Sequence, residues 1–304
     1  MNNGAVERKV NAYDERLRKS SVRSSHRFVN IGRICQVHKD GCRSFTLIEL
    51  LIVVAIIAIL CSMLLPALNC AKMTAQEISC KTRMRQIGLA QNAYTDDYNE
   101  WIVPASVWAS LSESDKEIYH EYGCHWYGLL SGFSGEKKAL TSGYNLKYKY
   151  SPYGIEASGD FACPSEPVGF GPRTMGKFQY THFAINVCLT GIKNTRDAFN
   201  AYQRKLSALT NPSQAMLIMD SKRQADYYVS SADGVAYRHG AIDPRPYSDS
   251  GSALITKGKS NMLFMDVHVD AVNYRTFINW KPQQDPVAPF TYMKIFLRGF
   301  DPSR

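Results

Sequence analysis

Acidic residues and a histidine alternate near the end of the chain, at a spacing that could bind a metal ion. Asp266, His268 and Asp270 are each separated by one residue, so a β-strand would place their side chains on one face. With His239 folded nearby, carboxylate and imidazole ligands of this kind would suit several divalent metals. The alternative is a half-buried strand with a solvated polar face. We take His239, Asp266 and His268 as a candidate metal site, and expect no other cofactor.

The chain has eight cysteines, and four of them lie in the long part that follows the apolar segment discussed below. If that part lies outside the cytoplasm, these four thiols meet an oxidising compartment. Four cysteines allow three full pairings, so one or two disulfides are expected without a unique assignment. No two of the four have the spacing of a zinc finger. The four residues are Cys80, Cys124, Cys163 and Cys188.

A search for enzyme motifs is negative. The sequence has no His-Glu-x-x-His, no Gly-x-Ser-x-Gly, no phosphate loop and no dinucleotide fingerprint, so it predicts no enzyme. A cluster of aromatic residues would form either a glycan-binding or partner-binding surface or, as is more common, part of the core. The cluster comprises Trp101, Trp108, Trp126, Tyr127, Tyr144, Tyr148, Tyr150 and Tyr153.

The positive charge of the chain is concentrated at its beginning. Residues 1–44 hold ten Lys and Arg against four Asp and Glu, and so carry +6 of the formal +9. The remaining 260 residues show no basic stripe interleaved with aromatic residues, which a nucleic-acid-binding surface would need. We expect no nucleic-acid partner.

One apolar segment is long enough to cross a membrane. Leu47 to Leu65 is 19 residues long and carries a single charge, on Glu49. At about 1.5 Å per residue a helix of this length would span roughly the 30 Å of a hydrocarbon layer. Basic residues lie on its N-terminal side, which predicts that this end is cytoplasmic and that the rest of the chain lies outside. They include Arg23, Arg27, Arg33, Lys39 and Arg43.

Glu49 stands out because a carboxylate inside an apolar membrane helix costs about 2.5–3.5 kcal/mol on insertion scales and tends to be functional. The N-terminus of a helix favours a negative charge in its first turn. A positively charged partner is therefore expected for this carboxylate. The alternative is that Glu49 sits at the interface with its carboxylate in water.

The residues around this segment resemble a known processing signal. Ser44-Phe45-Thr46-Leu47-Ile48-Glu49 resembles the class III signal of type IV prepilins and type II secretion pseudopilins, and the similarity extends to Leu68. In that family a membrane peptidase cuts after a small residue, usually Gly but here Ser44, and methylates the new N-terminal amine. The resemblance implies cleavage between Ser44 and Phe45 and a role for Glu49 in assembly.

Later segments resemble a large pseudopilin-like family of Planctomycetes, Verrucomicrobia and Lentisphaerae. The similar segments are residues 80–97, Cys163-Pro164, Arg238-His239-Gly240 and residues 261–269, where Val267 replaces a usual Gly. Because Cys80 and Cys163 both lie in such segments, the resemblance favours a disulfide between them.

Beyond Pro66 the sequence predicts an amphipathic helix to about Asp97, with Pro66 as a kink. Apolar runs at 215–219 and 261–272 predict strands. An α+β fold follows, in which a long N-terminal helix packs on an antiparallel sheet, as in pilins. The predicted apolar face of the helix is Leu68, Ala71, Ala75, Ile78, Met84, Ile87, Ala90 and Tyr94.

These patterns predict three parts: a cytoplasmic leader at 1–44, the transmembrane half of the helix at 45–66, and a periplasmic pilin-like body at 67–304. The function expected is that of a single-pass inner-membrane subunit of a pseudopilus, pilus or type II secretion apparatus. Its partners would be a prepilin peptidase and other pilin-like subunits. The alternatives are a membrane-anchored module that binds a glycan or protein and, third, a metal-dependent hydrolase.

Overall fold

The structure is a computed structural model. It describes residues 46–118, 121–132, 143–148, 159–192, 203–241, 257–280, 296 and 298–300. The chain divides into two compact units, residues 1–59 and 60–304.

A single helix, α2, runs from Leu47 to Asp97. Its most apolar 18-residue window has a mean hydropathy of 3.0 and no buried residue, so by length and composition this helix can cross a membrane. Pro66 lies inside the helix. Its backbone nitrogen carries no hydrogen and cannot donate to the preceding turn. The helix ends as predicted, because Asn99 and Glu100 adopt positive φ angles of 51° and 67° that stop a right-handed helix.

The last third of α2 forms one wall of the core. Its buried residues are spaced three or four apart, which places them on one face of the helix: Cys80, Met84, Ile87, Gly88, Ala90, Gln91, Tyr94 and Thr95. The predicted face was wrong at its beginning. Leu68 and Ile78 are exposed, and the buried stripe begins at Cys80, which the prediction left out.

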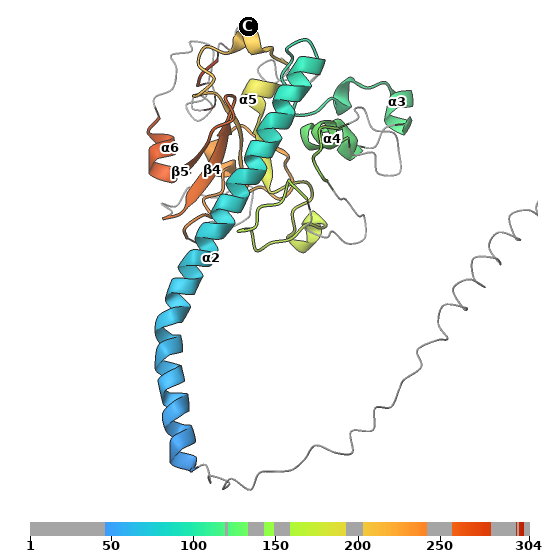
Figure 1. The fold of residues 1–304 in the computed structure, drawn as a ribbon. Coiled ribbons are helices and arrows are strands. Elements are labelled where there is room, and N and C mark those ends of the chain that lie inside the picture. The colour runs from blue at the N-terminus through green and yellow to red at the C-terminus, as the bar shows by residue number, and fades with distance from the viewer. Residues whose placement is uncertain are drawn as a thin grey trace, which may run out of the picture. The chain divides into compact units, whose positions relative to one another are not determined.

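The core is built on a five-stranded sheet of order β3-β1-β2-β4-β5. Figure 1 labels its strands β4 and β5. The strands are β1 Phe183–Asn186, β2 Met216–Asp220, β3 Tyr228–Val229, β4 Lys259–Phe264 and β5 Val269–Asn273. The α+β prediction is confirmed. Three of the four strand pairs are antiparallel, as predicted, whereas β1 and β3 are parallel, so the sheet is mixed.

The predicted strand at 261–272 is in fact a hairpin. Strands β4 and β5 pair from Lys259↔Asn273 to Leu263↔Val269, and the chain reverses between them. Val267 lies in this turn with a φ of 71°, a conformation that favours glycine over a β-branched residue. The turn was missed because valine occupies the position where a glycine would mark it, and Asp266 alone is a weak turn signal.

Short helices connect and cover these elements. The α-helices are α3 Glu113–Ile118, α4 Trp126–Ser131, α5 Val187–Thr190 and α6 Tyr274–Ile278. The 3-10 helices are η1 Trp108–Ser110, η2 Glu121–Cys124, η3 Arg173–Met175, η4 Leu206–Ala208 and η5 Ala232–Gly234. Helix α4 adds Trp126 and Tyr127, both fully buried, to the core.

Candidate functional site: the anchor signal and a buried cluster

The first turn of α2 is closed by a reciprocal pair of hydrogen bonds. The Thr46 backbone N–H donates to Glu49 Oε2 at 2.9 Å, and the Glu49 backbone N–H donates to Thr46 Oγ1 at 3.2 Å. The Thr46 hydroxyl also donates to Glu49 Oε2, at 3.0 Å. This is a capping box, in which an N-cap Thr and a Glu three residues later satisfy two otherwise unpaired backbone N–H groups.

Glu49 therefore caps the N-terminus of α2, a role that the sequence analysis did not predict. The signal was present as Thr46-x-x-Glu49 directly before an apolar run. Glu49 is fully exposed in the isolated chain, so the same carboxylate also remains accessible to other groups. The predicted cleavage residues Ser44 and Phe45 lie outside the described residues.

Four side chains that can bind metals converge inside the body. They come from different elements: Cys80 from α2, Asp220 from the end of β2, Cys163 from a loop, and His239 from a bridge to the first residue of β4. One ligand atom from each lies within 4.8 Å of the others, and all four residues are buried. Among the described residues this is the one group of its kind.

Hydrogen bonds hold these side chains in place. The loop around Cys163 is fixed to α2, where Gln76 donates to the Pro164 carbonyl at 3.0 Å and Arg83 donates to the Ala162 carbonyl at 2.6 Å. The backbone N–H groups of His239 and Lys259 each donate to the other residue's carbonyl, at 3.0 and 2.8 Å. Tertiary packing therefore assembles the cluster from four separate segments.

Direct contacts link the four ligand-type atoms. The Cys80 thiol donates to Asp220 Oδ1 at 3.8 Å, and His239 Nε2 lies 3.1 Å from Asp220 Oδ2. Cys163 Sγ lies 3.7 Å from His239 Nε2. The cluster is therefore one continuous group of interacting atoms.

The two thiols of the cluster differ in the direction of their pKa shifts. Burial raises the pKa of Cys80 well above its usual value, and a hydrogen bond to Cys163 adds to this. Burial also opposes ionisation of Cys163, but hydrogen bonds from Cys80 and His239 lower its pKa to about 6. Burial opposes the charge on His239, but the carboxylate of Asp220 outweighs burial and raises the His239 pKa to about 10. The cluster favours one thiolate beside an imidazolium–carboxylate pair.

The structure groups the predicted site residues differently from the sequence analysis. Cys80 and Cys163 do come together, and both are free thiols. His239 joins them and not Asp266 or His268, because His239 pairs with Lys259 at the start of β4, whereas Asp266 follows the end of that strand. Asp220 was missed as a ligand. The available signal was an acid that directly ends a buried apolar run.

Asp266 and His268 lie together in the exposed turn between β4 and β5. Asp266 Oδ1 forms a short contact with His268 Nδ1, and His268 Nε2 lies 3.6 Å from Asp270 Oδ2. The His268 ring stacks on Phe264 at 4.3 Å. These contacts lie within a turn, so Asp266 and His268 do not share the strand face that the sequence analysis expected.

The aromatic cluster is mostly internal. Trp126 and Tyr127 are fully buried, and the Trp126 indole N–H donates to the Tyr227 carbonyl at 2.7 Å. Trp101 is more exposed and lies under the Lys205 ammonium. Tyr150 and Tyr153 are outside the described residues. The described part of the cluster favours core packing over a continuous glycan-binding surface.

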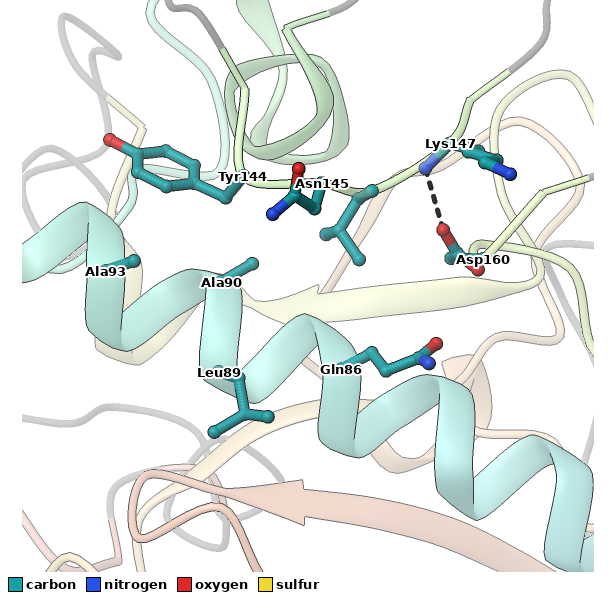
Figure 2. Close-up of a pocket in the computed structure, with 9 residues that line it drawn as sticks. Gln86, Leu89, Ala90, Ala93, Tyr144, Asn145, Lys147 and Asp160 are labelled. Carbon is teal, nitrogen blue, oxygen red and sulfur yellow. Dashed lines mark hydrogen bonds between the residues drawn. The ribbon is translucent and has the colours of Figure 1, made fainter.

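An open pocket of about 580 Å³ lies on another face of α2. Figure 2 shows α2 on one side of the pocket and the segment from Tyr144 to Lys147 on the other, with a hydrogen bond from the Lys147 backbone N–H to Asp160 at 2.7 Å. The α2 residues that line it are Gln86, Leu89, Ala90 and Ala93. A displayed binding module would have this hollow available, but its lining selects no ligand class.

Comparison with known proteins identifies the N-terminal region. Residues 39–65 match the model of the prokaryotic N-terminal methylation motif. No curated protein and no solved structure matches the chain. The matched residues include the capping box and most of the exposed apolar part of α2, which indicates membrane anchoring. The chain therefore carries, at residues 39–65, the class III signal of type IV prepilin-like proteins.

Proposed function

We propose that the chain is a prepilin-like subunit that a prepilin peptidase cuts between Ser44 and Phe45. It is then assembled or displayed at the inner membrane as part of a pseudopilus, a pilus or a type II secretion apparatus. The observation that carries the proposal is the match of residues 39–65 to the methylation motif, which includes the exposed apolar start of α2. Such subunits are structural proteins and not enzymes.

The proposed topology has the leader in the cytoplasm, one membrane span and the body in the periplasm. Two features support it. The basic residues precede the apolar segment, as the positive-inside rule requires. The apolar side chains from Leu47 to Leu65 are exposed in the isolated chain, so they are available to lipid or to the anchor helices of neighbouring subunits.

Glu49 has two roles in this proposal. Its capping bonds with Thr46 fix the first turn of the anchor helix. Its negative charge, costly within a membrane, would be balanced by a new terminal ammonium on Phe45, from the same chain or from a neighbour. Pairing between neighbours would set the register of one subunit against the next.

The first test is the N-terminal sequence and mass of the membrane-extracted protein, expressed with and without a prepilin peptidase. We expect a start at Phe45 with an added methyl group when the peptidase is present, and an intact leader when it is absent. A start beyond Pro66 in both cases would identify an ordinary secreted protein and would overturn the proposal.

The second test separates the two roles of Glu49. Glu49→Gln keeps a side-chain carbonyl that can accept the capping bonds, because Gln also serves in a capping box, but it removes the charge. Glu49→Ala removes both. We expect both variants to be cleaved normally and both to fail in assembly, measured by crosslinking between subunits in the membrane. Normal assembly of Glu49→Gln would show that capping alone is needed and would exclude the charge-pairing role.

A further inference from the structure

We propose that Cys80, Cys163, Asp220 and His239 form a closed tetrahedral site for a structural Zn²⁺ ion that fixes α2 to the sheet. This site is independent of the function proposed above, since it uses only side chains of the body.

The first argument is geometric. Zinc–ligand bonds of about 2.0–2.3 Å in a tetrahedron place neighbouring ligand atoms roughly 3.3–3.8 Å apart. The separations are 3.7 Å for Cys163 Sγ to His239 Nε2 and 3.8 Å for Cys80 Sγ to Asp220 Oδ1, while His239 Nε2 lies 3.1 Å from the other carboxylate oxygen, Asp220 Oδ2. Two edges of the tetrahedron are therefore close to their required lengths, and the four ligand atoms all lie within 4.8 Å of one another.

The second argument is the chemistry of the donors. Two sulfurs and one imidazole nitrogen select zinc over magnesium or calcium, which prefer oxygen ligands. A carboxylate completes a four-coordinate set. All four residues are at most 3% exposed, and no position is left open for water or substrate, which is the pattern of a structural and not a catalytic zinc site.

The third argument is the support around the ligands. Ser165 Oγ lies 3.2 Å from His239 Nδ1. A proton held on Nδ1 and donated to this hydroxyl leaves Nε2, the atom that faces the cluster, free to bind a metal. The Asn261 backbone N–H donates to Asp220 Oδ2 at 2.8 Å and orients the carboxylate. Partners of this kind commonly fix the ligands of metal sites.

An unsatisfied amide also lies at the cluster. The side chain of Asn261 is fully buried, and neither its Nδ2 nor its Oδ1 has a hydrogen-bond partner that meets normal geometry. Because the Asn261 backbone N–H donates to Asp220 Oδ2, this amide lies beside the cluster. An unpaired amide N–H at this place is a donor for a metal-bound thiolate.

The position of the site explains what an ion would do. The ligands come from α2, the loop at Cys163, the end of β2 and the residue facing the start of β4, so one ion would join four segments far apart in sequence. Zinc binding requires both thiols to ionise and His239 to lose its proton. The bound ion, two thiolates and a carboxylate would leave one net negative charge. The Arg238 guanidinium acts on Cys163 from within a buried ion pair with Glu166 at 2.9 Å.

The test uses the full chain purified in mild detergent. We expect one zinc per chain by elemental analysis, and after chelation and addition of Co²⁺ we expect the thiolate charge-transfer and visible d–d bands of a tetrahedral cobalt site. Cys163→Ser and His239→Gln should each lose the metal or reduce the cobalt bands. The control Cys188→Ser changes a buried cysteine outside the cluster and should leave both readouts unchanged.

Two results would overturn the proposal. One is a disulfide between Cys80 and Cys163, seen as a linked peptide after alkylation and digestion of the unreduced, untreated chain, because the two sulfurs cannot then act as separate thiolate ligands. The other is the failure of the wild-type chain, with both thiols reduced, to bind Zn²⁺ or Co²⁺. Both readouts use the wild type, so the test holds even if the cluster variants do not fold.

Discussion

Val267 holds a backbone conformation that costs it energy. Its φ of 71° is in the left-handed region, which costs an L-residue about 1–2 kcal/mol. Glycine avoids that cost but loses about 0.5–1 kcal/mol through its flexible unfolded state. We therefore expect Val267→Gly to raise the free energy of unfolding by roughly 0.5–1 kcal/mol, measured by urea unfolding of the full chain in detergent.

Val267→Ala is the matched control for this prediction. Alanine keeps the Cβ, and so the strain, but loses, as glycine also does, the methyl groups that Val267 places beside Gly88 of α2. The expected order of stability is Gly, then Val, then Ala. If the Gly variant is the least stable of the three, packing on α2 outweighs the backbone strain.

His125 makes the body sensitive to acid. Burial lowers its pKa to about 3, its Nδ1 contacts Ser106 Oγ at 3.0 Å, and its Nε2 has no partner among the described residues. The groups that face the ring are the tyrosines Tyr127, Tyr180 and Tyr227. Among the described residues, those that contact the ring therefore offer a charged imidazole no carboxylate.

The sign of the pH effect follows from this depressed pKa. In the unfolded chain the pKa is near 6.5, so the unfolded state takes up a proton first as the pH falls. The contribution is complete above pH 6.5 and is lost between there and about pH 3. We expect the free energy of unfolding to fall by about 2 kcal/mol from pH 7 to pH 5 on account of this residue.

The variant His125→Phe tests this assignment. It keeps an aromatic ring against Tyr227 and removes the titration. His182, whose pKa burial also lowers, is unchanged in both proteins and contributes equally to each. The difference in pH slope between the wild type and the variant therefore isolates His125. Identical slopes would exclude it as a source of acid sensitivity.

At the scale of single residues, the sequence identified three of the four residues of the buried cluster but did not predict that they lie together. Cys80, Cys163 and His239 were each identified as candidates, but two of them were assigned to a disulfide and the third to another metal site. The reason is that zinc-finger spacing is a local pattern, whereas these ligands come together only through the packing of α2 on the sheet. Asp220 had no signal beyond its position at the end of an apolar run.

At the scale of elements, α2 has an exposed apolar part and a part that is buried against the body. Two isoleucines of this helix differ in their exposed fraction. Ile87 is fully buried, whereas Ile78 on the same helix is 59% exposed. We expect Ile87→Ala to reduce the free energy of unfolding by about 2–4 kcal/mol through lost packing and a residual cavity. Ile78→Ala should change it by less than about 0.5 kcal/mol.

Both variants replace isoleucine by alanine within α2, so the change in helix propensity is the same in each. Urea unfolding of the two variants, followed by tryptophan fluorescence, measures the difference. Equal losses would mean that α2 does not bury its predicted face against the sheet.

Local sequence patterns were sufficient to predict some of the helices and strands but not all of them. The helix end at Asp97 and the strand β2 were predicted because caps, period and apolar runs are local signals. The hairpin of β4 and β5 and the parallel pairing of β1 with β3 were not. In the hairpin, Val267 occupies a position where glycine would have marked the turn, and the two-residue strand β3 is too short to produce a pattern.

At the scale of the whole molecule, the part of α2 that is available for anchoring is distinct from the part that packs in the core. Every described residue from Thr46 to Ala75 is exposed, and Gln76 is the first side chain of α2 that is half-buried. Gln76 also donates a hydrogen bond to the Pro164 carbonyl of the body at 3.0 Å. Residues before this point contribute little to the stability of the body.

We therefore expect a chain that begins at Ala71 to remain folded and to be soluble without detergent, because it lacks the exposed apolar helix but keeps the buried stripe from Cys80 to Thr95. Its thermal midpoint should lie within a few degrees of that of the full chain, measured by circular dichroism. A chain that begins at Gly88 would lose Cys80, Met84 and Ile87 from the core, and should not fold. If the Ala71 chain aggregates or unfolds, the apolar half of α2 is needed by the body itself, and a division into anchor and body would not describe this protein.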